Sequence, residues 1–154
     1  MIGFMFGPLL AGMLASGEPS GFAHWTAASL QGYQEKLAAN LDPKSKSGSE
    51  RLGRFGNHLF MLGYREGDGG AELHEGQVDI FVVENGAATL IVGGDMVDAK
   101  TTSPGEIRGT SINGGERVKL GAGDVIHIPA NTPHQLLIEA GGKFTYFVIK
   151  VDVK

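Results

Sequence analysis

The chain has 154 residues, 42% of them hydrophobic, which suffices for one folded domain with a hydrophobic core. Its net charge of −4 excludes the strongly basic surface that binding to nucleic acid or to an anionic membrane requires. The absence of cysteine excludes disulfides, thiolate metal sites and a cysteine nucleophile.

Residues 1–17, MIGFMFGPLLAGMLASG, form an apolar run that ends in small residues. Small residues at that point resemble a signal-peptide cleavage site, but no lysine or arginine precedes the run. The run is also short for a membrane span, and glycines and a proline interrupt it. Two alternatives stay open, an export signal or an apolar arm that packs on the domain or on a partner subunit. A cytoplasmic and an exported location are therefore both compatible with the sequence, and no membrane span is expected.

One helix is expected after this run. Thr26 can cap it, and Leu30, Tyr33 and Leu37 then repeat at helical spacing. The following stretch, residues 42–53, DPKSKSGSERLG, is polar and predicts a mobile loop. Residues 1–54 should thus comprise the arm, the helix and the loop.

From residue 55 to residue 154 the pattern predicts about eight short strands. They are HLFMLGY, AELHEG, DIFVVENG, ATLIVGG, ERVKLG, DVIHIP, HQLLIE and KFTYFVIKV, separated by Gly, Asn, Pro and Asp turn signals. One such turn is expected at Glu84-Asn85-Gly86. Close spacing of short strands predicts an all-β sandwich or barrel, with the short helix in front of it.

The stretch AELHEGQVDIFVVENG, residues 71–86, places ionisable side chains directly before a strand suited to a core. A charge buried there costs several kcal/mol unless it is paired or bound to a metal. In a strand, residues two apart share a face, so Glu72 and His74 point to the same side. Asp79 begins the next strand and can reach the same interior.

A second stretch, residues 121–138, GAGDVIHIPANTPHQLLI, brings another histidine to the start of a strand. Together the two stretches resemble the motifs of the cupin superfamily, whose fold is a double-stranded β-helix, or jelly-roll barrel. In the first motif, G-x5-H-x-H-x3–4-E-x6-G, Glu72 stands at the first His, His74 at the second and Asp79 at the Glu, and Gly86 closes it.

The second motif of the family, G-x5-P-x-G-x2-H-x3-N, runs through Gly123, Pro129 and His134. Asn131 stands where Gly is usual, and Ile138 replaces the final Asn. The resemblance covers residues 57–150 and implies a small single-domain metal-binding cupin.

The resemblance implies a metal site made of Glu72, His74, Asp79 and His134. Two of the four positions depart from the family pattern, but both carboxylates are still metal ligands. His74, His134 and Asp79 would form a 2-His-1-carboxylate set with Glu72 as a fourth ligand, suited to one divalent ion per chain, Fe, Mn, Cu, Ni or Zn. Against this, Glu72 can be a solvated edge residue, Asp79 a turn cap and each histidine an ordinary core residue. A barrel that has lost its metal and binds an organic ligand is the main alternative.

Other polar residues carry weaker signals. His127 either lines the barrel or is a satisfied core residue, His24 and His58 are expected in surface or packing roles, and Glu75 should point away from the site. Residues 97–115, VDAKTTSPGEIRGTSINGG, predict a long polar loop that acts as a lid or in assembly. Its arginine, Arg108, either clamps an anionic substrate, or it faces solvent or pairs with Glu106 or a neighbouring subunit.

The sequence thus predicts a metal-dependent enzyme acting on a small molecule, with oxygenase or oxidoreductase chemistry first and isomerase or lyase chemistry next. A non-catalytic binding or sensor protein is the alternative, and a purely structural role is the third. The resemblance also implies a homodimer, in which the apolar arm and the KFTYFVIKV strand would be covered. The substrate and the metal are not fixed by the sequence, because one cupin scaffold carries many reactions.

Overall fold

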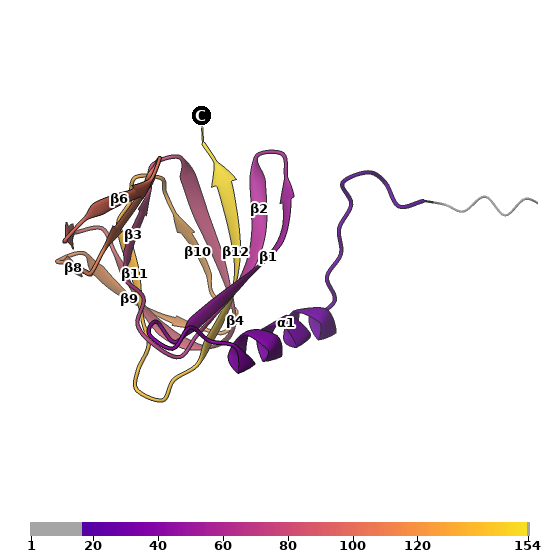
Figure 1. Cartoon of the computed structure of the whole chain (residues 1–154), viewed down its shortest axis with the longest axis horizontal. Coiled ribbons are helices and arrows are strands. Elements are labelled where there is room, and N and C mark those ends of the chain that lie inside the picture. The colour runs from indigo at the N-terminus through magenta and orange to yellow at the C-terminus, as the bar shows by residue number, and fades with distance from the viewer. Residues whose placement is uncertain (1–16, 154) are drawn as a thin grey trace, which may run out of the picture.

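The computed structural model describes residues 17–153 as one helix and twelve strands (Figure 1). The elements are α1 (Ala27–Ala39), β1 (Ser47–Phe55), β2 (His58–Arg65), β3 (Ala71–His74), β4 (Gln77–Val92), β5 (Asp95–Val97), β6 (Lys100–Ser103), β7 (Glu106–Gly109), β8 (Ser111–Asn113), β9 (Glu116–Gly121), β10 (Val125–Ile128), β11 (His134–Leu137) and β12 (Phe144–Asp152).

Ten of the strands form one antiparallel sheet that curls into a barrel-like shape, with α1 outside it (Figure 1). The long strand β4 belongs to both halves of this sheet. Its first part pairs with β12 and β10, and β12 continues to β2 and β1; we call this the β12 half. Its second part pairs with β9 and β11, and β11 continues to β3, β7 and β6; we call this the β11 half. The remaining strands, β5 and β8, form a separate pair.

The core lies on the inner face of the sheet. Alternate residues of β12, Phe144, Tyr146 and Val148, pack there with Phe81 and Val83 of β4. Residues two apart in a strand share a face, so Lys150 and Asp79 continue these two inward rows. The register agrees, because Lys150 lies directly opposite Asp79.

Helix α1 packs on the outer face of the β12 half. The Thr26 side chain accepts a hydrogen bond from the Ser29 N–H and so caps the helix, as predicted. Leu37 is the buried residue of the helix and joins Leu62 and Tyr64 of β2 in a second cluster.

Two predicted loops are wrong. Residues 42–53 include most of β1, which pairs along its length with β2, so this stretch is part of the sheet. Residues 97–115 contain β6 and β7, which lie at one edge of the ten-stranded sheet, and β8, which pairs with β5 outside it. Composition alone hides such strands, since an edge strand buries little apolar surface.

The turn predicted at Glu84-Asn85-Gly86 is also wrong. DIFVV and ATLIV form one strand, β4, and the turn signal marks a shift of register against β12 at Thr145 and Tyr146. Gly86 has φ +81° there, a conformation that glycine adopts without strain. The other predicted strands occur as β2, β3, β9, β10, β11 and β12, which confirms an all-β fold with one short helix.

The predictions of an export signal or a packing arm concern residues 1–17, and nearly all of these lie outside the described residues. Strand β12 does not offer the free surface expected of it, because it lies between β2 and β4 and its apolar residues pack on both faces. The homodimer stays a prediction. No helix in residues 17–153 is long and apolar enough to cross a membrane.

Candidate metal centre

The four predicted ligands meet inside the barrel, between the two halves of the sheet. Glu72 and His74 lie on β3 and His134 begins β11, while Asp79 comes from the first part of β4. His134 pairs directly with Glu72 in the register of β11 and β3. His74, Asp79 and His134 are each at most 3% exposed, whereas the Glu72 side chain is 32% exposed.

Glu72, His74 and His134 each offer a donor atom within 4.8 Å of the others, and Asp79 lies close to the two imidazoles. Asp79 Oδ2 lies 3.3 Å from His74 Nε2 and 3.6 Å from His134 Nε2. Glu72 Oε2 lies 3.7 Å and 3.8 Å from the same two nitrogens. Two ligands about 2.1 Å from a metal are roughly 3.0–3.4 Å apart in octahedral or tetrahedral geometry. The Asp79 distances are near this range, and those of Glu72 exceed it by a few tenths of an ångström.

The tautomers of both histidines follow from their outer contacts. His74 Nδ1 lies 2.8 Å and 3.0 Å from the two carboxylate oxygens of Glu106, and His134 Nδ1 lies 3.0 Å from the Thr132 carbonyl oxygen. Because these oxygens accept, each Nδ1 carries the proton and donates it. In the neutral tautomer that these contacts fix, each ring turns its Nε2 lone pair to the centre, as in metal-ligating histidines.

His134 Nε2 has no hydrogen-bond partner, although it is buried. Among residues 17–153, it is the one buried side-chain nitrogen or oxygen without a hydrogen-bond partner. A buried acceptor without a partner costs about 1–3 kcal/mol. A divalent ion would satisfy it, so the donor set of two imidazoles and two carboxylates fits a metal.

Lys150 of β12 reaches into the same centre. Its ammonium nitrogen donates to Asp79 Oδ1 at 2.7 Å, to Asp79 Oδ2 at 2.8 Å and to His74 Nε2 at 2.9 Å. The sequence reasoning missed this residue. The signal that could have found it is a charged residue in the inward row of the apolar strand FTYFVIKV. The charged residues before β4 were noticed for the same reason.

Asp79 is an ionised carboxylate in this setting. Burial opposes the charge, but the Lys150 ammonium, which donates to both carboxylate oxygens, outweighs it and holds the pKa of Asp79 well below its ordinary value. The Asp79 side chain therefore carries its negative charge at neutral pH, next to the positive charge of Lys150.

A cavity of about 220 Å³ opens beside the centre. Glu72, Asp79, Lys150, Arg65, Arg108 and Tyr146 supply its polar lining. Arg65 Nε donates to the Tyr146 hydroxyl at 3.2 Å, and burial raises the pKa of Tyr146, which stays a neutral phenol. The space suits a small molecule with an anionic group, since two guanidinium groups line it.

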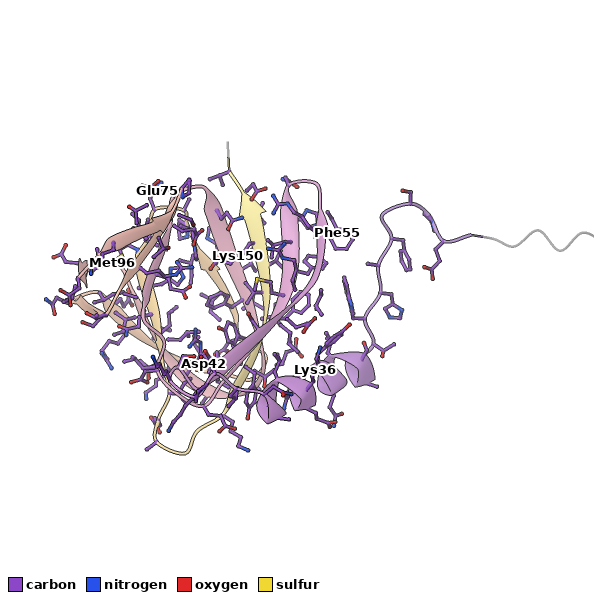
Figure 2. All side chains as sticks on the ribbon, viewed as in Figure 1. Lys36, Asp42, Phe55, Glu75, Met96 and Lys150 are labelled. Atoms are coloured by element: carbon purple, nitrogen blue, oxygen red, sulfur yellow. The ribbon has the colours of Figure 1, made fainter. Side chains whose placement is uncertain are left out.

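The remaining predictions have mixed outcomes. Arg108 pairs with Glu106 at 2.9 Å and also lines the cavity, so both predicted roles are compatible with its position. His127 is exposed, and both roles proposed for it are wrong, because Ile126 and Ile128 are the inward residues of β10. Glu75 is exposed and outside the site, as predicted (Figure 2). The pairing of Arg108 with Glu106 was one of the predicted alternatives, but the contact of Glu106 with His74 was missed because its strand was predicted as a loop.

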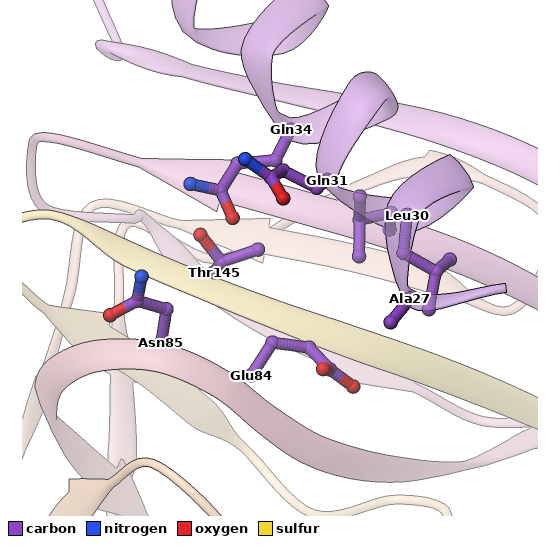
Figure 3. Close-up of a pocket in the computed structure, with 8 residues that line it drawn as sticks. Ala27, Leu30, Gln31, Gln34, Glu84, Asn85 and Thr145 are labelled. Carbon is purple, nitrogen blue, oxygen red and sulfur yellow. The ribbon is translucent and has the colours of Figure 1, made fainter.

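A larger cleft, of about 520 Å³, lies beneath α1 on the outer face of the β12 half. Figure 3 shows Gln31 and Gln34 of the helix above Thr145 of β12, with Asn85 and Glu84 of β4 beside it. Thr145 points to the opposite face from Tyr146. This cleft is therefore separate from the histidine centre.

No protein-family model matches the sequence, and the comparison with curated proteins gives no match. Solved structures match in fold. One from Thermus thermophilus is 18% identical, with a TM-score of 0.55 over 77% of this chain and 92% of its own. A predicted oxalate decarboxylase from Thermotoga maritima is 16% identical, with a TM-score of 0.50 over 70% of this chain and 81% of its own.

A third matching structure is named as a cupin. It is a Cupin 2 conserved barrel domain protein from Salinispora arenicola, 17% identical, with a TM-score of 0.50 over 75% of this chain and 83% of its own. Together with the curled antiparallel sheet and the cluster of Glu72, His74 and His134 inside it, these likenesses show that the chain has the cupin fold.

Proposed function

We propose that the chain is a metal-dependent enzyme that acts on a small molecule, with oxygenase or oxidoreductase chemistry first and lyase or isomerase chemistry next. One observation carries the proposal. Two buried imidazoles present unprotonated Nε2 atoms to a space shared with two carboxylates, directly beside a cavity of ligand size.

The residues that would hold the ion are His74, His134, Asp79 and Glu72. A divalent transition metal bound there would supply Lewis acidity and an open position for substrate, water or O₂. Glu106 and the Thr132 carbonyl fix the two imidazole rings. Glu72 is the most exposed of the four side chains. It would either coordinate the ion or stay free of it as a base that accepts a proton from a bound substrate.

The substrate that the cavity favours is a small carboxylate or a similar anion. Arg65 and Arg108 supply two permanent positive charges, and the Tyr146 hydroxyl remains protonated. The likeness to a predicted oxalate decarboxylase supports an acid as substrate, but it rests on the fold and leaves the reaction open.

Metal analysis tests the proposal. Protein purified without a histidine tag and loaded separately with Fe(II), Mn(II), Cu(II), Ni(II) or Zn(II) should retain about one ion per chain for at least one metal. A His74→Ala/His134→Ala double variant treated in the same way is the control. If the natural chain retains no more of any metal than this variant, the proposal is wrong.

A second candidate is a metal-free binding protein, and the position of Lys150 favours it. An ammonium group already lies on Asp79 and His74, so the centre is neutralised in part without an ion. The two candidates differ in one measurement, since a metal-free binder would bind small carboxylates equally well before and after dialysis against EDTA.

A further inference from the structure

The side chain of Lys150 is held inside the barrel by the same atoms that a metal would need. It follows Phe144, Tyr146 and Val148 in the inward row of β12, and only 16% of the side chain is exposed. Figure 2 labels Lys150 on this strand. Its three acceptors are both oxygens of Asp79 and Nε2 of His74, at 2.7–2.9 Å. These contacts have the length of charge-assisted hydrogen bonds.

A metal and this ammonium cannot share the centre. An ion coordinated by Asp79 and His74 Nε2 would take the lone pairs to which Lys150 now donates. It would also stand within a few ångströms of the ammonium, where like charges in a weakly screened interior repel strongly. Metal binding therefore requires Lys150 to leave these two residues.

There is room for the displaced side chain. Lys150 lines the adjoining cavity of about 220 Å³, so its four-carbon stem can turn from the centre into that space without unfolding β12. The ends of the strand stay fixed, because β12 is paired with β2 on one side and β4 on the other.

We propose that Lys150 is a built-in counter-cation, which neutralises Asp79 in the metal-free chain and is displaced by the incoming metal into the substrate cavity. The inference rests on the proposed metal site. It makes metal binding an exchange of one cation for another, so the affinity for metal is lower than the donor set alone would give. In the metal-free state the same lysine stabilises the barrel.

Two substitutions at Lys150 test the exchange. Lys150→Met keeps most of the length of the side chain without the charge, and Lys150→Gln keeps a polar end if the methionine variant folds poorly. Lys143→Met is the matched control, because Lys143 directly precedes β12 but its side chain is 71% exposed and its Nζ lies 3.8 Å from Glu66 Oε1. Zn(II) alone is the probe, and its affinity is measured by competition with a chromophoric chelator at one fixed pH.

Both Lys150 variants should bind Zn(II) at least tenfold more tightly than the natural chain, and Lys143→Met should bind as the natural chain does. The metal-free Lys150 variants should also melt at a lower temperature than the metal-free natural chain. Saturating Zn(II) should close that gap, because the metal then supplies the missing positive charge.

The outcomes separate the exchange from the metal site itself. If the natural chain binds Zn(II) and the Lys150 variants bind it equally or more weakly, the exchange is refuted while the metal site stands. If only the Lys150 variants bind Zn(II) and the natural chain binds no divalent transition metal, Lys150 blocks the site without being displaced, and both the exchange and the proposed function fail. If none of the proteins binds Zn(II) or any other divalent transition metal, the proposed function fails, and the exchange fails with it.

Discussion

His134 is the residue at which an ion would change the energetics most directly. Its Nδ1 is held by the Thr132 carbonyl, and its buried Nε2 lacks a partner in the described chain. Replacing His134 by Ala removes a ligand and also a buried polar atom without a partner. We expect metal content to fall to near zero while the cooperative β-rich fold persists, as measured by elemental analysis and circular dichroism.

Glu72→Ala is the graded comparison for His134→Ala. Glu72 Oε2 lies farther from the imidazoles than Asp79 Oδ2 does, and its side chain is partly exposed. A small effect would leave His74, Asp79 and His134 as the ligand set. Full metal retention in His134→Ala would show that the site has been assigned wrongly.

Glu106 is expected to act on the metal through His74. Its carboxylate accepts the Nδ1 proton of His74 and fixes the ring with Nε2 toward the centre. Contacts of this kind typically contribute 10–100-fold to metal affinity, so Glu106→Ala should weaken binding by about that factor. Glu75→Ala is the control, because Glu75 is close in sequence to His74 but exposed. Equal affinities of the two variants in a chelator competition would contradict the role of Glu106.

Asp79 should make the metal-free protein sensitive to acid. Its pKa is held below the ordinary value in the fold, so the unfolded chain takes up a proton at a higher pH than the folded chain. The stability gained from ionised Asp79 is complete above a pH of about 4 and is lost progressively as the pH falls below it. Urea denaturation between pH 6 and pH 2 should show a steeper loss for the natural chain than for Asp79→Asn. Parallel curves would contradict the linkage.

At the scale of elements, strand β4 joins the two halves of the sheet through one irregularity. Gly86 has φ +81°, and a Cβ atom there would lie 1.8 Å from the Lys143 carbonyl oxygen. Gly93 has φ +76° but open space around it. Gly93→Ala should therefore cost only the left-handed strain of about 1–2 kcal/mol, and Gly86→Ala about 3 kcal/mol or more. Denaturant unfolding of both variants checks this, and equal losses would show that the clash is relieved elsewhere.

The elements differ in how far the sequence could predict them. Strands that bury one face or both, such as β2, β11 and β12, stand out by their apolar residues. The exposed strand β6 and the half-exposed β1 have too little apolar surface for the same signal, and they were read as loops. The continuity of β4 across Glu84-Asn85-Gly86 depends on pairing with β12, which local turn statistics do not contain.

The same limit applies to the site. His74, Asp79 and His134 could be found because motif spacing and strand alternation place them on one interior. Glu106, Arg65 and Lys150 come from three other strands, and only the sheet order β2-β12-β4-β11-β3-β7 brings them to the centre. Contacts of that kind are set by tertiary pairing rather than by local sequence.

At the scale of the molecule, the barrel should fold without a metal. Its main core cluster is built from aromatic and aliphatic residues of several strands, including Phe81, Leu90, Phe144 and Tyr146, and a second cluster lies under α1. The metal-free centre also has its own cation in Lys150, so removing an ion does not leave Asp79 uncompensated.

Protein dialysed against EDTA should therefore keep its β-sheet circular dichroism and unfold in one cooperative transition. Restoring a bound metal at about 100 times its Kd should add about 2.7 kcal/mol of stability, because the ion binds the folded chain alone. Differential scanning calorimetry with and without the metal measures both effects. Loss of the cooperative transition on metal removal would instead make the ion part of the fold, and the fixed imidazoles would then serve structure rather than an exchangeable, reactive centre.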